Sequence, residues 1–356
     1  MTELISKKPF FERFAIWLKK NLFNTPTNSV ISIFLLAFIW KGIEGLFTWI
    51  FIKGVWSGGA SVCREAGGFC FPFLFEKTRF IIFGFYPDGQ LWRPTCAMLI
   101  LIGTLFYSKE PNRWNKKLAY LWSISTFFIF WLMGGGLGLT EVTNDKWGGL
   151  PLTLLLATIG IVCSYPLGIV LALMRRSKLK VLKSISVVYI EIIRGVPLIS
   201  VLFMSSVMFP LFLPEGVNFD KLLRAQIAII LFVSAYMAEV IRGGLSSIPK
   251  GQYEAAHTLG LSYFDTMRSI IIPQAIRIVI PPTVNTAIGM FKDTSLVLII
   301  ALFDLLNTTK TSLRDPEWLG FSLEAYVFVG LIYFVFCFSM SKYSQRLERE
   351  FGMKER

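Results

Sequence analysis

Long apolar stretches separated by short polar segments dominate the pattern of this chain. A helix needs about 20 mostly apolar residues to cross the hydrocarbon core of a bilayer, and eight stretches approach or exceed that length. The predicted spans are residues 30–51, 94–107, 118–139, 152–173, 185–213, 225–241, 278–303 and 323–340. The pattern therefore predicts an all-α integral membrane protein with about eight transmembrane helices.

Two of these spans are long for one crossing and contain helix breakers. The fifth carries Gly195 and Pro197, and the seventh carries Pro281 and Pro282 followed by the polar run 292–294. Proline removes a backbone donor and clashes with the preceding helical turn. We therefore expect both helices to be interrupted.

Composition excludes a water-soluble protein. Apolar residues make up 54% of the chain and charged residues only 17%, against roughly 25% in soluble proteins. A net charge of +13 would suit nucleic acid, but the basic residues occur in short runs between the apolar stretches. This distribution indicates a lipid environment and no nucleic-acid partner.

The basic residues also predict the orientation of the chain. Most of the 36 Lys and Arg residues lie in the N-terminal arm, the C-terminal tail and every second loop. Cytoplasmic loops of membrane proteins carry this excess, so we expect both termini in the cytoplasm. Residues 1–28 lack the small-residue cleavage site of a signal peptide.

The chain divides into three parts that differ in their predicted spans and in their charged residues. Residues 1–150 hold three spans and a large outer loop, residues 151–345 hold five spans and most of the intramembrane charge, and residues 346–356 form a cytoplasmic tail. The outer loop contains Cys63 and Cys70, which form a disulfide if that face is oxidising and remain free thiols otherwise. No grouping of Cys, His or acidic residues suggests a metal site.

The cytoplasmic segment after the sixth span carries the clearest motif. Residues 252–259 are good helix formers with small alanines at the centre, and Gly260 follows as a helix-ending residue. Glu254-Ala255-Ala256, then Gly260, then Ile270-x-Ile272-Pro273 resembles the EAA signature of ABC importer permeases. Further motifs resemble those of polar amino-acid permeases of the histidine-permease type: Tyr189-x-Glu191-x-x-Arg194-Gly195-x-Pro197-Leu198, Tyr236-x-x-Glu239-x-x-Arg242-Gly243-Gly244, Ile280-Pro281-Pro282-x-x-Asn285 and Lys292-Asp293-Thr294-Ser295-Leu296.

This resemblance covers about residues 150–345 and implies the transmembrane core of a type I ABC importer. The additional N-terminal three-helix part resembles the M-type permease subunit of general L-amino-acid transport systems. The family implies an ABC ATPase dimer that binds Mg-ATP, a second homologous permease in a heterodimer, and a periplasmic amino-acid-binding protein, all at a bacterial inner membrane. The chain itself contains no phosphate-binding Gly-x-x-x-x-Gly-Lys-Ser/Thr loop. We therefore expect no bound cofactor and ATP hydrolysis on a separate subunit.

Four residues of the motif, Glu254, Ala255, Ala256 and Gly260, are expected to couple the permease to the ATPase. A short helix with small residues suits docking into a groove of a partner protein. Glu254 would pair with an arginine of that partner or cap one of its helices.

Charged residues inside spans are costly and usually functional. Glu191 and Arg194 are three residues apart, and we expect them to pair and brace the break in the fifth span; the alternative is contact with substrate. Glu239 and Arg242 have the same spacing near the cytoplasmic boundary and are expected to form a salt bridge.

The seventh span supplies the candidate substrate residues. Broken transporter helices line substrate cavities, and the polar residues in this span are Asn285, Lys292, Asp293, Thr294 and Ser295. They would bind the carboxylate and the ammonium group of an amino acid. Alternatively, Lys292 and Asp293 pair with other permease charges and only hold a gate.

Two broader alternatives remain open at this stage. The chain is either the substrate-binding permease or a permease that completes the gate without binding substrate. A membrane enzyme using Glu239 and Asp293 is disfavoured because no second acidic cluster accompanies them. The sequence leaves open which amino acids are carried.

Overall fold

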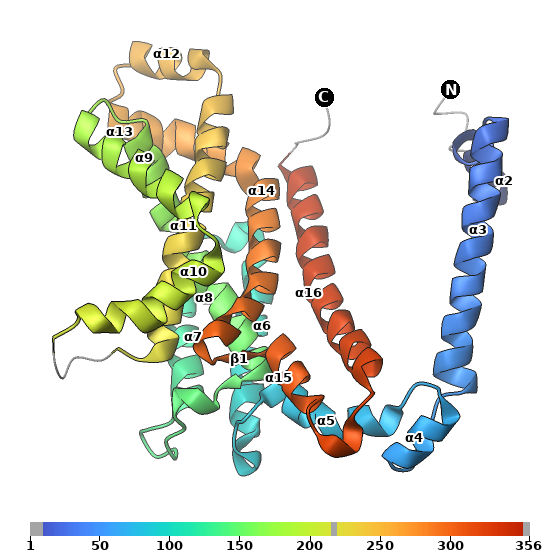
Figure 1. Ribbon diagram of the computed structural model, residues 1–356. Coiled ribbons are helices and arrows are strands. Elements are labelled where there is room, and N and C mark those ends of the chain that lie inside the picture. Colours follow the sequence, from blue (N-terminus) through green and yellow to red (C-terminus); the bar gives the residue numbers. More distant parts are fainter. Residues whose placement is uncertain (1–9, 215–218, 352–356) are drawn as a thin grey trace. The chain divides into compact units, whose positions relative to one another are not determined.

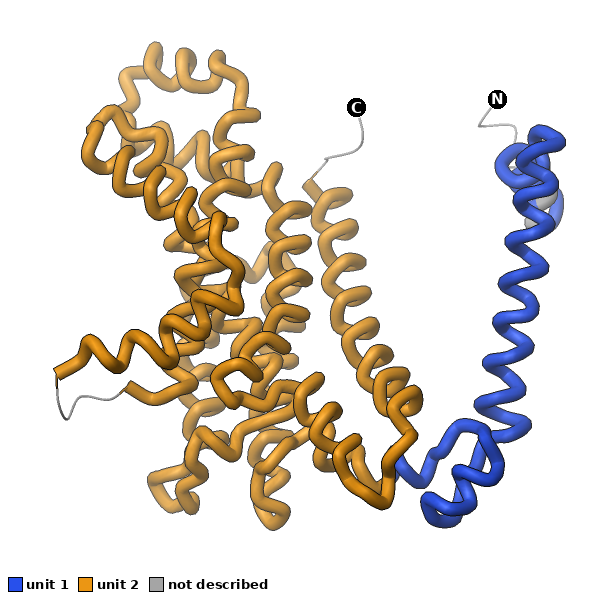
Figure 2. Tube along the Cα trace, in the orientation of Figure 1, with its two compact units in different colours: residues 1–75 blue, residues 76–356 orange. Residues whose placement is uncertain are grey.

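The computed structural model describes residues 10–214 and 219–351, and apart from a two-residue strand their regular structure is helical (Figure 1). Contacts divide the chain into two compact units, Met1–Phe75 and Glu76–Arg356 (Figure 2). The all-α fold class is confirmed. The functional division at residue 150 stays a prediction. The second compact unit, which is defined by contacts within the chain, begins well before that residue, at Glu76.

The first unit is built around one long apolar helix. It contains α2 (Phe10–Asn21), α3 (Pro26–Phe47), α4 (Ala60–Ala66) and the first residues of α5 (Phe71–Phe83). The helix α3 begins where the Thr25 side chain accepts a hydrogen bond from the N–H of Asn28, with Pro26 in its first turn. Only 6% of the most apolar stretch of α3 and its π-helical extension is buried within the chain. The other residues of the first unit therefore leave nearly the whole circumference of this helix uncovered.

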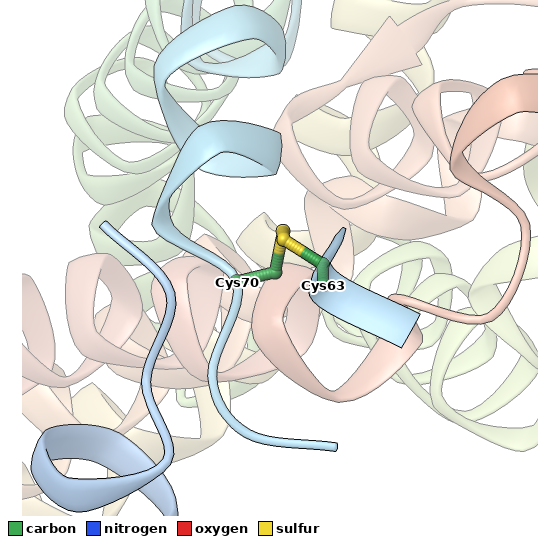
Figure 3. The surroundings of a disulfide bond; sticks show 2 residues. All are labelled: Cys63 and Cys70. Atoms are coloured by element: carbon green, nitrogen blue, oxygen red, sulfur yellow. A yellow bond between two sulfur atoms is a disulfide. The ribbon is translucent and has the colours of Figure 1, made fainter. Parts of the chain in front are cut away.

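A disulfide closes part of the loop between α3 and α5 in the first unit (Figure 3). Cys63 of α4 and Cys70, directly before α5, have their Cα atoms 5.5 Å apart. Next to this bond, the N–H of Val55 donates to the carbonyl of Phe69, and the N–H of Phe71 donates to the carbonyl of Val55. Of the two states that the sequence leaves open, the structure has the disulfide.

The second unit contains the helices that carry the site. They are α6 (Trp92–Ser108), α7 (Lys116–Gly134), α8 (Gly149–Arg175), α9 (Lys180–Gly195), α10 (Leu198–Phe203), α11 (Lys221–Ser247), α12 (Lys250–Thr258), α13 (Tyr263–Thr266), α14 (Ile272–Asp293), α15 (Leu305–Ser312) and α16 (Ser322–Glu350). The short strand β1 (Phe303–Asp304) forms parallel bridges with Gly148 and Gly149.

Small residues allow the central helices α8, α11 and α14 to approach one another closely. A Cβ added at Gly168 of α8 would lie 2.6 Å from the Cβ of Met237 on α11. One added at Gly244 of α11 would lie 3.0 Å from the carbonyl oxygen of Ala275 on α14. Membrane helices associate through such contacts because lipid provides no hydrophobic driving force between them. These three helices form the core that supports the site.

The number of candidate spans agrees with the prediction. In the described ranges, seven helices are long and apolar enough to cross a membrane, and an eighth span results if α9 and the segment Leu198–Phe212 are counted together. These two segments meet at a bend of 104°. The backbone of Val196, which precedes Pro197, is extended at this point, as expected for a residue before proline. The predicted interruption of the fifth span is confirmed.

The α-helix of the seventh span is interrupted next to the polar run 292–294, as expected, and not at Pro281 or Pro282. The helix α14 continues through both prolines and ends at Asp293. Membrane helices tolerate proline because neighbouring helices and polar side chains satisfy the freed backbone groups. The change of structure comes later, where the α-helix gives way to a 3₁₀ segment at Thr294–Ile300.

The third predicted span also ends earlier than expected, at Gly134. Gly135 has a φ of +88° and turns the chain away from the helix axis. The guanidinium of Arg93, whose side chain is 1% exposed, holds this turn. Its Nε donates to the carbonyl of Leu132 at 2.6 Å and its Nη1 to the carbonyl of Thr140 at 2.8 Å. A buried arginine thus caps the end of α7.

Candidate functional site

A cavity of about 590 Å³ opens where the break between α9 and α10 faces α11 and α14. Its lining is Arg194, Gly195, Val196, Pro197, Leu198, Phe232, Val233, Tyr236, Thr286, Gly289, Met290, Asp293 and Leu296. The break supplies backbone as well as side chains, since the residues at 195–197 leave the regular helix. The volume falls within the range of small-molecule sites, roughly 300–1,000 Å³.

Two opposite charges lie in the lining of this cavity. Arg194 comes from the last turn of α9, and Asp293 is the last residue of α14. The guanidinium of Arg194 lies over the ring of Tyr236, 5.7 Å from its centroid. In the parts of the chain that the structure describes, no ion pair within 4.0 Å reaches Asp293. The cavity can therefore offer a cation and an anion to one ligand.

The five predicted substrate residues do not share one face of α14. Asp293 lines the cavity, together with Thr286 seven residues before it. Asn285 and Lys292, also seven residues apart, are exposed and do not belong to the cavity lining. Seven residues are about two helical turns, so each pair lies on one face, and these faces are offset by one residue position.

The remaining two predicted residues lie in the 3₁₀ segment. Thr294 is fully buried, and its hydroxyl donates to the carbonyl of Phe291. Ser295 is partly buried, and its carbonyl accepts a hydrogen bond from the Asn307 side chain at 2.8 Å. Both residues hold the segment next to the cavity and are absent from its lining.

Glu239 of α11 is the centre of a charge cluster beside the cavity. Its side chain is 17% exposed, and its carboxylate oxygens lie 2.8 Å from Arg175, 3.1 Å from Arg242 and 3.7 Å from Arg194. One carboxylate therefore joins α8, α9 and α11. Without it, three arginines would repel one another at close range.

All four predicted ion-pair residues form ion pairs, but one pair differs from the expectation. Glu239 pairs with Arg242 as expected. Glu191 pairs with Arg175 at 3.0 Å, not with Arg194, which points toward Glu239. The cause is that the end of α8 brings Arg175 between two carboxylates. Sequence reasoning missed Arg175 because only the fold brings it near these residues.

The helix α12 carries the residues of the EAA-like motif. Glu254 and Ala255 are exposed, whereas Ala256 is buried against the chain itself. The helix ends at Thr258, and Gly260 has a φ of +71°, which L side chains rarely adopt. Two of the four motif residues thus face outward, one anchors the helix, and one turns the chain after it.

A set of exposed apolar side chains follows α12. Leu259, Tyr263 and Phe264 are all largely exposed. Exposed apolar groups that adjoin a polar helix are typical of protein contact sites. The segment from α12 to α13 is therefore a candidate docking surface.

Comparison with known families and proteins gives consistent matches. The family model of binding-protein-dependent transport system inner membrane components matches residues 164–351, a range that contains the cavity, the Glu239 cluster and α12. The inner membrane amino-acid ABC transporter permease protein YhdY of Escherichia coli is 48% identical over 345 residues, which cover 96% of this chain and 94% of that protein. The glutamate/glutamine/aspartate/asparagine transport system permease protein BztC of Rhodobacter capsulatus is 37% identical over 408 aligned residues, covering 94% and 93%.

A solved structure is also similar to part of the chain. The crystal structure of an amino acid ABC transporter with histidines has a TM-score of 0.51 and 33% sequence identity. The match covers 57% of this chain and 92% of the other.

Proposed function

The chain belongs to the family of binding-protein-dependent transport system inner membrane components, and from this membership we propose roles for its cavity and its docking helix. The protein is a permease subunit of an amino-acid ABC importer, a multi-pass protein of the inner membrane, and ATP is hydrolysed on a separate subunit. The family implies ATPase and binding-protein partners.

The amino acid passes through the cavity beside Arg194 and Asp293 in this proposal. The observation that carries it is the presence of one cation and one anion in the same lining. A free amino acid has a carboxylate and an ammonium group, and an unpaired buried charge costs several kcal/mol. Arg194 suits the carboxylate because a guanidinium forms paired hydrogen bonds, and Asp293 suits the ammonium group.

The rest of the cavity lining suits amino-acid substrates with a broad range of side chains. Val196, Phe232 and Met290 are apolar, and Thr286 and Tyr236 add hydroxyl groups. Among the relatives, the name of BztC includes acidic amino acids and their amides. We assign polar and acidic amino acids as candidate substrates of this chain.

Asp293→Asn tests the substrate role. The assembled importer, reconstituted in vesicles, should lose about five- to thirtyfold in uptake, because about one to two kcal/mol of ion pairing is lost, while basal ATPase activity is retained. Lys292→Gln is the matched control, since it removes a neighbouring charge outside the cavity, and uptake should stay within twofold.

The same pair of variants separates the two permease alternatives. Normal uptake by Asp293→Asn would contradict substrate contact. It would favour a chain that only completes the gate, with the substrate held by the second permease. Loss of assembly in the variant would instead assign Asp293 a structural role.

We further propose that α12 docks on the ATPase dimer, which binds Mg-ATP, with both termini of the chain on that cytoplasmic side. The second permease is a homologous chain in a heterodimer, and the periplasmic amino-acid-binding protein docks on the opposite face. The exposure of Glu254 and Ala255 and the adjoining apolar side chains support the docking role.

Gly260→Leu tests the docking helix. Its positive φ disfavours a side chain by about 1 kcal/mol or more, so the turn after α12 should be distorted. We expect uptake to fall several-fold while membrane insertion and assembly stay normal. Undiminished uptake would contradict the coupling role.

The orientation is checked separately. A tag at the C-terminus should be protected from protease added outside sealed right-side-out vesicles.

A further inference from the structure

The short helix α2 has one aromatic face. Phe11, Phe14 and Trp17 are 83%, 50% and 53% exposed. At 3.6 residues per turn, these three positions fall within about a third of the helix circumference. Lys19 and Lys20 are exposed and lie outside that arc. Aromatic residues opposite lysines are typical of helices that lie in a membrane interface.

The chain between α2 and α3 is too short to take α2 far from the membrane. Residues 22–25 separate the two helices and extend over at most about 15 Å. The hydroxyl of Ser32, in the second turn of α3, donates to the carbonyl of Leu22 at 2.9 Å. The N–H of Phe23 donates to the carbonyl of Leu18 at 3.1 Å. The end of α2 is thus fastened to the first turns of α3, beside which it lies in Figure 1.

We propose that α2 lies in the headgroup layer of the bilayer, with Phe11, Phe14 and Trp17 inserted between the lipids and the lysines near anionic headgroups. The leaflet follows from the proposed orientation, which places α2 on the cytoplasmic side. Anionic lipids attract basic residues next to a membrane-spanning helix. The occupant of the aromatic face is therefore an anionic lipid surface.

This position gives α2 a mechanical role. The helix α3 buries little of its surface within the chain, so contacts inside the chain do little to fix its depth. A helix held in the interface and tied to the Leu22–Ser32 hydrogen bond sets the depth at which α3 enters the membrane.

Spin labels at single cysteines test the proposal in the full chain. The background carries Cys96→Ala, Cys163→Ala and Cys337→Ala and keeps the disulfide. Nitroxides are attached at Phe14→Cys or Trp17→Cys, with Lys20→Cys as the matched control on the polar face. The protein is reconstituted in vesicles of phosphatidylethanolamine and phosphatidylglycerol, and collisions with oxygen and with a water-soluble nickel chelate are measured.

The ratio of oxygen to nickel collisions should be at least about threefold higher at positions 14 and 17 than at position 20, because an interfacial helix buries its apolar face about 5–10 Å deep. Equal and high nickel collisions at all three positions would place α2 in water. Exclusion of both reagents at positions 14 and 17 would show a protein contact. Either result overturns the proposal.

The charge contribution is measured with Lys19→Gln and Lys20→Gln in the Trp17→Cys protein. The collision ratio should fall about twofold or more in vesicles with phosphatidylglycerol and stay unchanged in phosphatidylcholine. An unchanged ratio in both lipids would refute the role of anionic headgroups.

Adding the impermeant nickel chelate to one side of oriented vesicles identifies the leaflet. Interfacial labels on the outer side would refute the proposed orientation and leave the interfacial position of α2 intact. Amino-acid uptake is read separately, so a failure of the substrate proposal is distinguishable from a failure of this one.

Discussion

The helix α3 of the first unit and the helices α8 and α11 of the second unit are all apolar enough to span a membrane, yet the chain buries them very differently. Only 6% of the most apolar stretch of the α3 span is buried, against 44% for α8 and 50% for α11. Hydropathy therefore identifies a membrane helix but does not tell whether it packs on protein or faces lipid.

The glycines of α3 and α8 show the same difference in packing, because only those of α8 face another helix. Gly42 and Gly45 of α3 have no atom within 4 Å of an added Cβ. Gly160 and Gly168 of α8, by contrast, lie directly against side chains of α11. The same residue type serves close packing in α8 and leaves open space beside α3.

Among the substitutions that test this comparison, Gly168→Ala is expected to have the largest effect, on the yield of assembled complex. The added Cβ would meet the Cβ of Met237 at 2.6 Å and its carbonyl carbon at 3.1 Å, and such overpacking costs about 1–3 kcal/mol. The yield of assembled complex in detergent should fall severalfold. Gly42→Ala is the matched change in α3 and should leave the yield unaltered; equal losses would remove the distinction between the two units.

An intermediate and local effect is expected from the double change Cys63→Ser and Cys70→Ser. The disulfide closes a short loop in the first unit, and its loss should destabilise that loop by about 2–3 kcal/mol. Limited proteolysis should then cut between α3 and α5 faster. Uptake through the second unit should be largely retained, and its complete loss would show that the two units act together in transport.

The smallest effect is expected from Lys77→Met in α5. The ammonium of Lys77 lies 2.6 Å from Asp315 and 2.7 Å from Glu76. Burial lowers the pKa of Lys77, but the hydrogen bonds with Asp315 and Glu76 more than offset this, and the pKa is raised overall. The hydrogen bond from Lys77 lowers the pKa of Asp315.

The signs of these shifts set a pH window for the ion pair. The raised pKa of Lys77 contributes stability below about pH 10 that is lost as the pH rises through its folded pKa, and the lowered pKa of Asp315 contributes stability above about pH 4 that is lost as the pH falls through its folded pKa. Lys77→Met should lower the melting temperature by at most a few degrees, equally at pH 6 and pH 8. Lys53→Met in the first unit is the control, and a pH-dependent difference between these two pH values would contradict the assignment.

The sequence predicts those features that depend on local chemistry. Apolar length places the spans, and Gly195 followed by Pro197 predicts the bend because both effects act on their own backbone. Pro281 and Pro282 have the same local effect, but the surrounding second unit keeps α14 helical through them. The local effect of proline therefore identifies where a helix can break. Whether it does break depends on the packing around it.

The cavity shows a second reason why the sequence alone does not predict the whole site. Residues 285 and 292 share a helix face, and so do residues 286 and 293. Periodicity alone gives no preference between these neighbouring faces, and only the packing of α14 selects the second one. In the same way, the approach of Arg175 to Glu191 depends on how two helix ends meet.

The buried Arg93 has a consequence for how the chain is made. Its guanidinium donates to the side chain of Gln90, to the carbonyl of Leu132 near the far end of α7 and, 47 residues along the chain, to the carbonyl of Thr140. A charged arginine is costly to leave in a bilayer without partners. During synthesis, two of the three acceptors of Arg93 exist only after the ribosome has completed α7, so we expect α6 to reach its final position together with α7.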